Sequence, residues 1–273
     1  KVNAKIGTDY KPFNYYGAAD AEEIIIAMGS VCECAEELID YLNARGRKVG
    51  IVEVHLYRPW STKYLLNVMP ETVKKIAVLD RTKEPGGTGE PLYLDVVTAL
   101  RGTKFESCLI CGGRYGLGSK DVQPGDVLAV YENLWSDAPK KEFTISITDD
   151  VTNLSIHGSE NPDVAPKGTK ACKFWGLGAD GTVGANKNSV KIIGDHTDMK
   201  AQAYFQYDSK KSGGLTISHL RFGKTPIQSA YFIEAANFIA CHNPSYVTRY
   251  DMVSDLKDGG TFLLNSPWTL EQM

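Results

Sequence analysis

Short apolar runs alternate with amphipathic segments along the first half of the chain. Runs rich in Ile, Val and Leu predict strands at residues 23–28, 49–56, 75–79 and 108–111. Helical spacing of apolar residues predicts helices at residues 35–41, 61–68, 91–100 and 126–134. Strands that alternate with helices pair in parallel and are covered on both faces. The first half is therefore predicted to form a parallel sheet with flanking helices.

A second pattern begins after a polar stretch that contains Pro162, Pro166 and Gly168. A short alternating strand at residues 143–147 lies between two charged pairs, and we place a domain boundary within residues 136–150. Beyond it, the pattern predicts strands at residues 171–176, 201–207, 214–220, 236–241 and 260–264. Helices are predicted at residues 182–193, 226–234 and 246–257. The whole chain is thus predicted to be α/β, with two domains.

The composition is that of an ordinary globular protein, with 42% hydrophobic and 23% charged residues in 273. A net charge of −3 argues against a general nucleic-acid binder, and no apolar run reaches the roughly 20 residues of a membrane span. We therefore expect neither a nucleic-acid nor a membrane partner. No secretory signal opens the chain, and the missing initial Met leads us to expect a piece of a longer protein.

Cysteine spacing gives no metal signature. Cys108 and Cys111 form a CxxC pattern, but no second pair stands at zinc spacing. The six cysteines are therefore interpreted as small buried side chains in a reducing compartment, and no metal site is predicted.

The glycine-rich segment at residues 174–187 is the strongest chemical signal. Gly176, Gly178 and Gly181 follow the G-x-G-x-x-G spacing, between a predicted strand and a predicted helix. In that setting the backbone can approach an anion, and the start of the helix supplies free N–H groups. Thr182 could cap those groups or contact a phosphate. The segment predicts a site for a phosphate-bearing ligand.

Three lysines bear on this prediction. Lys187 stands near the start of the helix, where a cation opposes the helix dipole unless an anion is bound. Lys210 and Lys211 follow the next strand, where a plain dinucleotide site would have an acid. They favour a phosphate on the ribose, as in coenzyme A or NADP, although Asp208 could serve a free ribose. The alternative is a solvated hairpin tip and a solvent-facing Lys187.

No complete catalytic set is present. The charged loop at residues 80–87 is expected to be held by internal salt bridges or to form a subunit contact, and the glycines at 112–118 suit either an anion or a packing turn. His242, in a turn at a strand end, is expected to be structural. No catalytic residue is predicted.

Several longer strings together resemble the pyruvate:ferredoxin (flavodoxin) oxidoreductases. Residues 10–17 resemble the segment that leads out of the family's first domain. A second group of strings resembles the family's second domain, which is like the C-terminal domain of transketolases. These strings are residues 53–59, 76–86, 89–96 and 112–117. A third group of strings resembles the family's third, gamma-type domain. These strings are residues 174–193, 209–214, 217–223 and 238–244. The match covers nearly the whole chain.

The resemblance implies a lead-in segment at residues 1–20, a transketolase C-terminal-like domain at 21–138 and a truncated gamma-type domain at 139–273. It implies that the parent converts pyruvate and coenzyme A to acetyl-CoA and CO₂ while reducing ferredoxin or flavodoxin. It also implies that this portion cannot perform the reaction by itself. Thiamine diphosphate, Mg and 4Fe-4S clusters do that chemistry in the family, and this chain lacks the Gly-Asp-Gly motif and the cysteine runs that hold them.

The resemblance also gives the glycine segment a ligand, because the third domain is implicated in holding coenzyme A. The candidate contacts are Gly178, Asp180, Gly181, Thr182, Val183, Lys187, Lys210 and Lys211. Expected partners are the remaining domains, a second copy in a homodimer, and ferredoxin or flavodoxin, in the cytoplasm or a reducing organelle. The alternatives are an assembly module that binds no ligand and an NADP-binding oxidoreductase domain.

Overall fold

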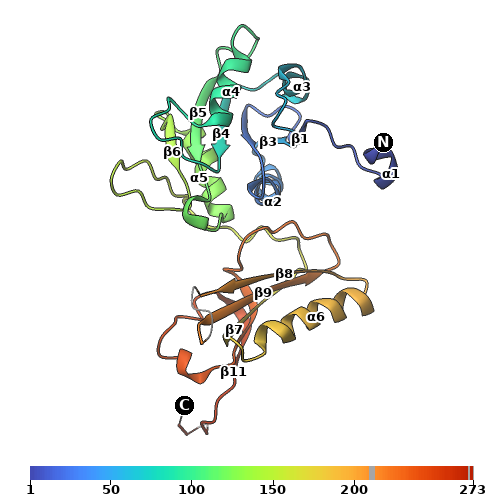
Figure 1. Cartoon of the computed structure of the whole chain (residues 1–273), viewed down its shortest axis with the longest axis vertical. Coiled ribbons are helices and arrows are strands. Elements are labelled where there is room, and N and C mark those ends of the chain that lie inside the picture. The colour runs from blue at the N-terminus through green and yellow to red at the C-terminus, as the bar shows by residue number, and fades with distance from the viewer. Residues whose placement is uncertain (209–212, 270, 273) are drawn as a thin grey trace. The chain divides into compact units, whose positions relative to one another are not determined.

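The chain divides into two compact units (Figure 1). The computed structural model describes residues 1–208, 213–269 and 271–272. The first unit comprises Lys1–Val164 and Gln228–Tyr231, and the second comprises Ala165–Ile227 and Phe232–Met273. The compact units divide after residue 164. The boundary between residues 138 and 139 is expected for the family's domains, and it stays a prediction.

The first unit is built on a six-stranded sheet with the order β1-β3-β2-β4-β5-β6. Its strands are β1 (Phe13–Gly17), β2 (Glu23–Ala27), β3 (Val49–Val54), β4 (Lys75–Asp80), β5 (Leu109–Arg114) and β6 (Glu142–Thr144). All neighbours pair in parallel except β1, which runs antiparallel to β3 at one edge. The sheet predicted for the first half is therefore confirmed, with one added antiparallel strand.

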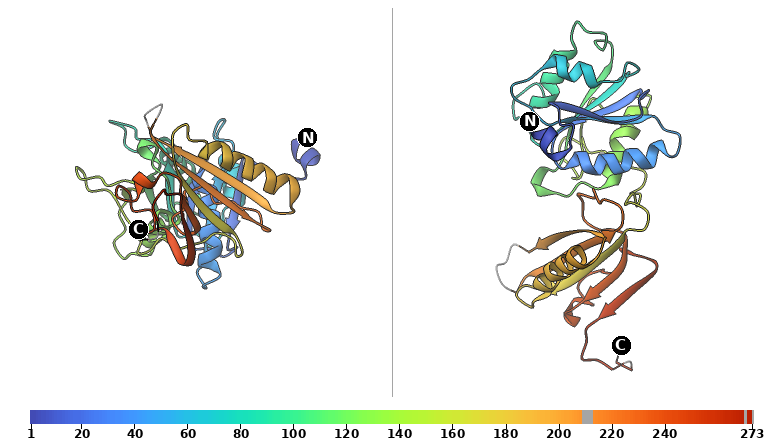
Figure 2. Two further views of the ribbon diagram at one scale, coloured as in Figure 1. Left: turned by 90° about the horizontal axis from the view of Figure 1, so that it is seen from below. Right: turned by 90° about the vertical axis from the view of Figure 1, so that its right-hand side faces the viewer.

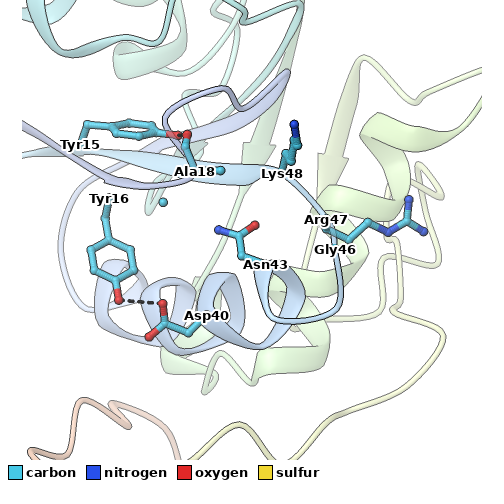
Figure 3. Close-up of a pocket in the computed structure, with 9 residues that line it drawn as sticks. Tyr15, Tyr16, Ala18, Asp40, Asn43, Gly46, Arg47 and Lys48 are labelled. Atoms are coloured by element: carbon cyan, nitrogen blue, oxygen red, sulfur yellow. Dashed lines mark hydrogen bonds between the residues drawn. The ribbon is translucent and has the colours of Figure 1, made fainter.

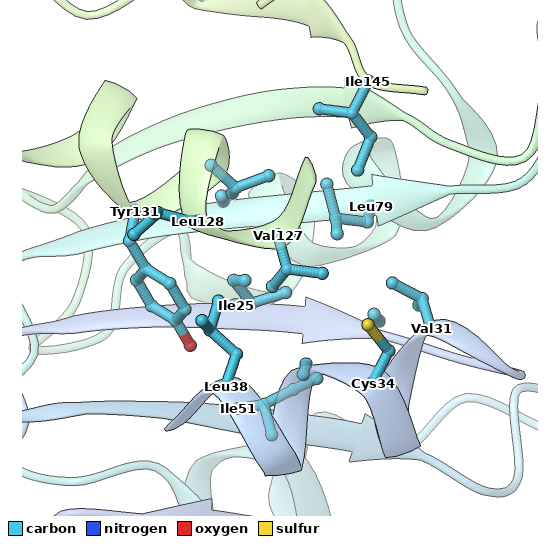
Figure 4. Close-up of a cluster of buried hydrophobic side chains, with 14 of the residues drawn as sticks. Ile25, Val31, Cys34, Leu38, Ile51, Leu79, Val127, Leu128, Tyr131 and Ile145 are labelled. Carbon is cyan, nitrogen blue, oxygen red and sulfur yellow. The ribbon is translucent and has the colours of Figure 1, made fainter. Parts of the chain in front are cut away.

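Helices cover both faces of this sheet because its strands are apolar on both sides. Its helical elements are α1 (Val2–Ile6), α2 (Val31–Asn43), α3 (Thr62–Val68), α4 (Pro91–Leu100), the 3₁₀ turn η1 (Leu117–Ser119) and α5 (Pro124–Trp135). Ile25 and Ile51 face α2 and α5, where Leu38 and Val127 complete one core (Figure 4). Neighbouring positions such as Ile24 point the other way, into a second core with α3 and α4.

The second unit contains a five-stranded mixed sheet with the order β11-β10-β7-β9-β8. Its strands are β7 (Lys170–Leu177), β8 (Lys200–Tyr207), β9 (Leu215–Gly223), β10 (Ala236–Cys241) and β11 (Leu256–Leu264). β9 runs antiparallel to both β7 and β8, whereas β10 pairs in parallel with β7 and β11. The helix α6 (Thr182–His196) packs along β8, β9 and β7 (Figure 2).

Two predicted helices of the second half are wrong. Residues 226–234 form no helix; the Gln228 backbone N–H and the hydroxyls of Ser229 and Tyr231 donate to Glu37 of α2. Residues 246–257 contribute only the end of the short 3₁₀ turn η2 (Pro244–Tyr246) and the start of β11. The apolar spacing there serves the core, in which Tyr246 and Met252 are buried.

Candidate functional site

The glycine segment forms a tight turn between β7 and α6, as its spacing predicts. Gly176 is buried beside the helix, and a Cβ on it would come 2.4 Å from the Thr182 hydroxyl oxygen. Gly181 has φ +90° at the N-cap position of α6, a conformation that other residues rarely adopt. The Gly178 N–H donates to Gly214 O at 2.7 Å, which ties the turn to the start of β9. Both ends of the turn are thus fixed.

The Asp180 carboxylate organises the interior of this turn. Its two oxygens accept the backbone N–H groups of Leu177 and Thr182, each at 2.8 Å. Partial burial raises the pKa of Asp180, but these hydrogen bonds and the nearby His242 outweigh it, and the pKa lies below its usual range. An internal anion therefore already occupies part of the helix N-terminus.

The first turn of α6 contains two amides that cannot bond within the helix. Ala185 N–H makes the first intrahelical hydrogen bond, to Gly181 O, and the Thr182 N–H is taken by Asp180. The amides of Val183 and Gly184 consequently have no intrahelical acceptor. With the positive end of the helix dipole, they form the part of the segment that can bind a phosphate or another anion.

Thr182 has a partner that the sequence did not reveal. Its buried hydroxyl lies 2.7 Å from Nδ1 of His242, which follows β10. The backbone N–H of His242 also donates to Trp175 O at the end of β7. The two residues are 60 positions apart, and only the parallel pairing of β10 with β7 brings them together. His242 thus braces the first turn of α6, which fits the structural role expected for it.

Of the predicted lysines, the structure describes Lys187, which does not lie at the turn. Lys187 is exposed one turn further along α6, and its Nζ lies 5.5 Å from the ring centroid of Phe205 on β8. This cation–π contact gives it a partner without a bound anion. Lys210 and Lys211 lie outside the described residues, so their predicted role stays a prediction. The structure brings together Gly178, Asp180, Gly181, Thr182 and Val183.

Hydrogen bonds anchor the start of the charged loop after β4, whereas its predicted salt bridges or subunit contact stay predictions. Asp80 is buried and accepts the N–H groups of Leu92 and Tyr93 at the start of α4, at 2.9 and 3.1 Å. Glu90 pairs with Arg114 at 2.6 Å, and both side chains are nearly buried. These groups serve the fold of the first unit.

A groove in the first unit lies between β1 and the turn that follows α2 (Figure 3). Its polar side chains already have partners. Tyr16 donates to Asp40 at 2.8 Å, and Lys48 pairs with Asp20. Asn43 exchanges two hydrogen bonds with the backbone of Val49. No predicted site residue lies in this groove.

The fold and the turn define a two-unit α/β protein with a candidate anion-binding loop at a helix N-terminus. In the part of the chain that the structure describes, no helix is both long and apolar enough to cross a membrane. Comparison with family models then identifies both halves. Residues 21–127 match "Pyruvate:ferredoxin oxidoreductase core domain II", and residues 171–272 match "Pyruvate ferredoxin/flavodoxin oxidoreductase". The chain belongs to the pyruvate:ferredoxin/flavodoxin oxidoreductase family.

Individual relatives are similar along the whole chain. Pyruvate:ferredoxin oxidoreductase of Moorella thermoacetica is 61% identical over 100% of this chain, and pyruvate-flavodoxin oxidoreductase of Klebsiella pneumoniae is 56% identical over 98%. The mitochondrial pyruvate dehydrogenase [NADP(+)] of Euglena gracilis is 54% identical over 100%. The chain spans 23% of the first two relatives and 15% of the third.

Proposed function

We propose that this chain is the scaffold and coenzyme A docking portion of a pyruvate:ferredoxin or pyruvate:flavodoxin oxidoreductase. The parent reaction would be the oxidative decarboxylation of pyruvate to acetyl-CoA, with reduction of an iron–sulfur or flavin carrier. The names of the relatives support the pyruvate and carrier assignments. The observation that carries the docking role is the turn before α6, which leaves the Val183 and Gly184 amides without intrahelical acceptors.

In this proposal the turn binds the diphosphate of coenzyme A. The Val183 and Gly184 amides would donate to its oxygens, while Gly178 and Gly181 allow the backbone to approach. Asp180 would hold the turn in shape and would not contact the phosphate, because both its oxygens already accept backbone N–H groups. Lys210 and Lys211 would bind the ribose phosphate.

The redox and decarboxylation chemistry belongs to other parts of the parent in this proposal. Among the described residues, no group of three or more His, Cys, Asp or Glu is placed to hold a metal ion. We assign thiamine diphosphate, Mg and the 4Fe-4S clusters to the remaining domains, which would be the first partners of this chain. Ferredoxin or flavodoxin and a second copy of the parent are the further proposed partners, in the cytoplasm or a reducing organelle.

Steady-state kinetics of the parent enzyme test the docking role. The double variant Lys210→Ala/Lys211→Ala is expected to raise the KM for coenzyme A by about tenfold or more, since two phosphate-binding cations are lost, and to leave the KM for pyruvate unchanged. Lys191→Ala, which removes an exposed cation further along α6, is the matched control. An unchanged KM for coenzyme A in the double variant would show that the lysine assignment is wrong.

The internal capping by Asp180 favours a second candidate, an assembly module whose glycines serve only the turn. Calorimetry distinguishes the candidates, because the assembly module binds neither coenzyme A nor desulfo-coenzyme A. Binding of NADPH in preference to coenzyme A would instead identify an NADP-binding domain.

A further inference from the structure

The strand β8 (Lys200–Tyr207) forms one edge of the second sheet, and no described strand pairs with its outer side. None of its residues is buried, whereas most residues of the neighbouring strand β9 are. Open edges are usually protected from other chains by a proline, a bulge or a central charge. β8 has no proline, pairs with β9 in unbroken register, and carries its one charge at its start. The edge can therefore accept a further strand.

The pairing of β8 with β9 defines which backbone groups of β8 face outward. The Asp208 N–H donates to Leu215 O at 2.9 Å, which makes these two residues a hydrogen-bonded pair. In an antiparallel ladder such pairs recur at every second residue, so the even-numbered residues of β8 bond to β9. The residues whose backbone N–H and C=O groups point away from the sheet are therefore Ala201, Ala203, Phe205 and Tyr207.

β8 is complementary to a second copy of itself in one antiparallel register. With Tyr204 opposite Tyr204, the outward-facing residues form hydrogen-bonded pairs, and Lys200 lies opposite Asp208 at both ends. On the face that contacts α6, each alanine of one copy then lies opposite an aromatic ring of the other. These small–large pairs are Ala201–Tyr207 and Ala203–Phe205. Opposite charges and matched sizes favour cross-strand pairing, and a shift by two residues in either direction separates Lys200 from Asp208.

Gln202 gives an independent reason to expect a partner at this edge. Its Oε1 is buried and has no hydrogen-bond partner among the described residues. A buried amide oxygen without a donor destabilises the strand that carries it. In the same register Gln202 lies opposite Gln206 of the second copy, whose exposed side-chain amide can donate to it. Pairing of two β8 strands would thus supply the missing donor.

We propose that β8 is an interaction surface for a second copy of this chain, with the two β8 strands antiparallel about a twofold axis at Tyr204. The two sheets would join through roughly eight backbone hydrogen bonds. Each copy uses its β8 edge once, so the contact closes as a dimer and does not extend into a fibre. This inference rests on the homodimer of the proposed function and names the surface through which its two copies meet.

A charge exchange tests the pairing, with sedimentation of the whole polypeptide that contains this chain as the measurement. Lys200→Asp or Asp208→Lys puts like charges opposite each other at both ends, and each should raise the dimer dissociation constant by about tenfold. The double variant Lys200→Asp/Asp208→Lys should return it to within about twofold of the unsubstituted value. The two residues stand about 26 Å apart along one strand, so this recovery requires a second copy. Asp258→Lys, on the opposite edge strand β11, is the matched control and should change nothing.

A backbone variant tests the same ladder without a charge. Ala203→Pro removes an outward N–H that β9 does not use, a change that an edge strand tolerates, and it should raise the dissociation constant by about tenfold or more. A double charge variant that dimerises no more tightly than the single ones would overturn the pairing. So would Ala203→Pro with an unchanged dissociation constant, and a lowered melting temperature in that case would assign the edge to another part of the parent. The coenzyme A kinetics of Lys210→Ala/Lys211→Ala test the docking role separately, so either proposal can fail alone.

Discussion

At the scale of single residues, Gly176 shows how a missing side chain fixes the candidate site. A Cβ at this position would lie 2.4 Å from the Thr182 Oγ1 and 2.9 Å from an Asp180 oxygen. Gly176→Ala is therefore expected to destabilise the second unit by about 1–3 kcal/mol, because the start of α6 must move. Urea unfolding measures the loss. Gly184→Ala, where the added carbon meets open space inside α6, should be neutral or stabilising by up to about 1 kcal/mol.

His219 on β9 makes the stability of the second unit depend on pH. Its Nδ1 accepts the Ile233 N–H at 3.1 Å, and its ring stacks on Phe232. Burial, then Lys173 and Arg221, lower the pKa of His219 to about 3 from 6.5. Between these values the unfolded chain binds a proton that the folded unit does not. Stability is therefore complete above about pH 6.5 and falls with acid, by up to about 1.4 kcal/mol per pH unit.

Urea unfolding between about pH 7 and pH 4 measures this slope. His219→Phe keeps a ring to stack on Phe232 but cannot titrate, so its profile over that range should be flatter even though it is less stable at neutral pH. His196→Gln, at the exposed end of α6, should retain the wild-type slope. A His219→Phe protein with that slope would contradict the assignment.

At the scale of elements, α4 begins on a cap from another element. Its N-cap residue, Glu90, makes no capping hydrogen bond with its side chain, whereas Asp80 at the end of β4 accepts the N–H groups of Leu92 and Tyr93. Asp80→Ala leaves both groups without this acceptor and should destabilise the first unit by about 1–2 kcal/mol. Asp80→Asn keeps one acceptor oxygen and should cost less. Denaturant unfolding measures the stability of both variants, with the exposed Glu106→Gln as a control. If Asp80→Ala were as stable as the unsubstituted protein, Asp80 would not be the cap of α4.

The elements also show where prediction from sequence succeeds. Strands that are buried on both faces carry a local signal, so β2, β3 and β4 lie where their apolar runs predict. Helical spacing of apolar residues wrongly predicts helices at residues 226–234 and 246–257, because the polar and apolar side chains there make tertiary contacts. In the candidate site, glycine spacing located the turn before α6. It could not reveal that Asp180 fills part of the helix terminus or that His242 supports Thr182, because those contacts depend on the folded geometry.

At the scale of the whole molecule, each unit has its own buried core. Leu38 lies in the core of the first unit between α2 and the sheet, and Ile239 lies in that of the second on β10. Leu38→Ala removes fully buried atoms and should destabilise the first unit by about 2–5 kcal/mol. Because the two cores are separate, native-state hydrogen exchange should show lower protection in β2, β3 and β4 but not in β7 and β9. Ile239→Ala should give the reverse pattern. Equal losses of protection in both sheets with either variant would mean that the units unfold together.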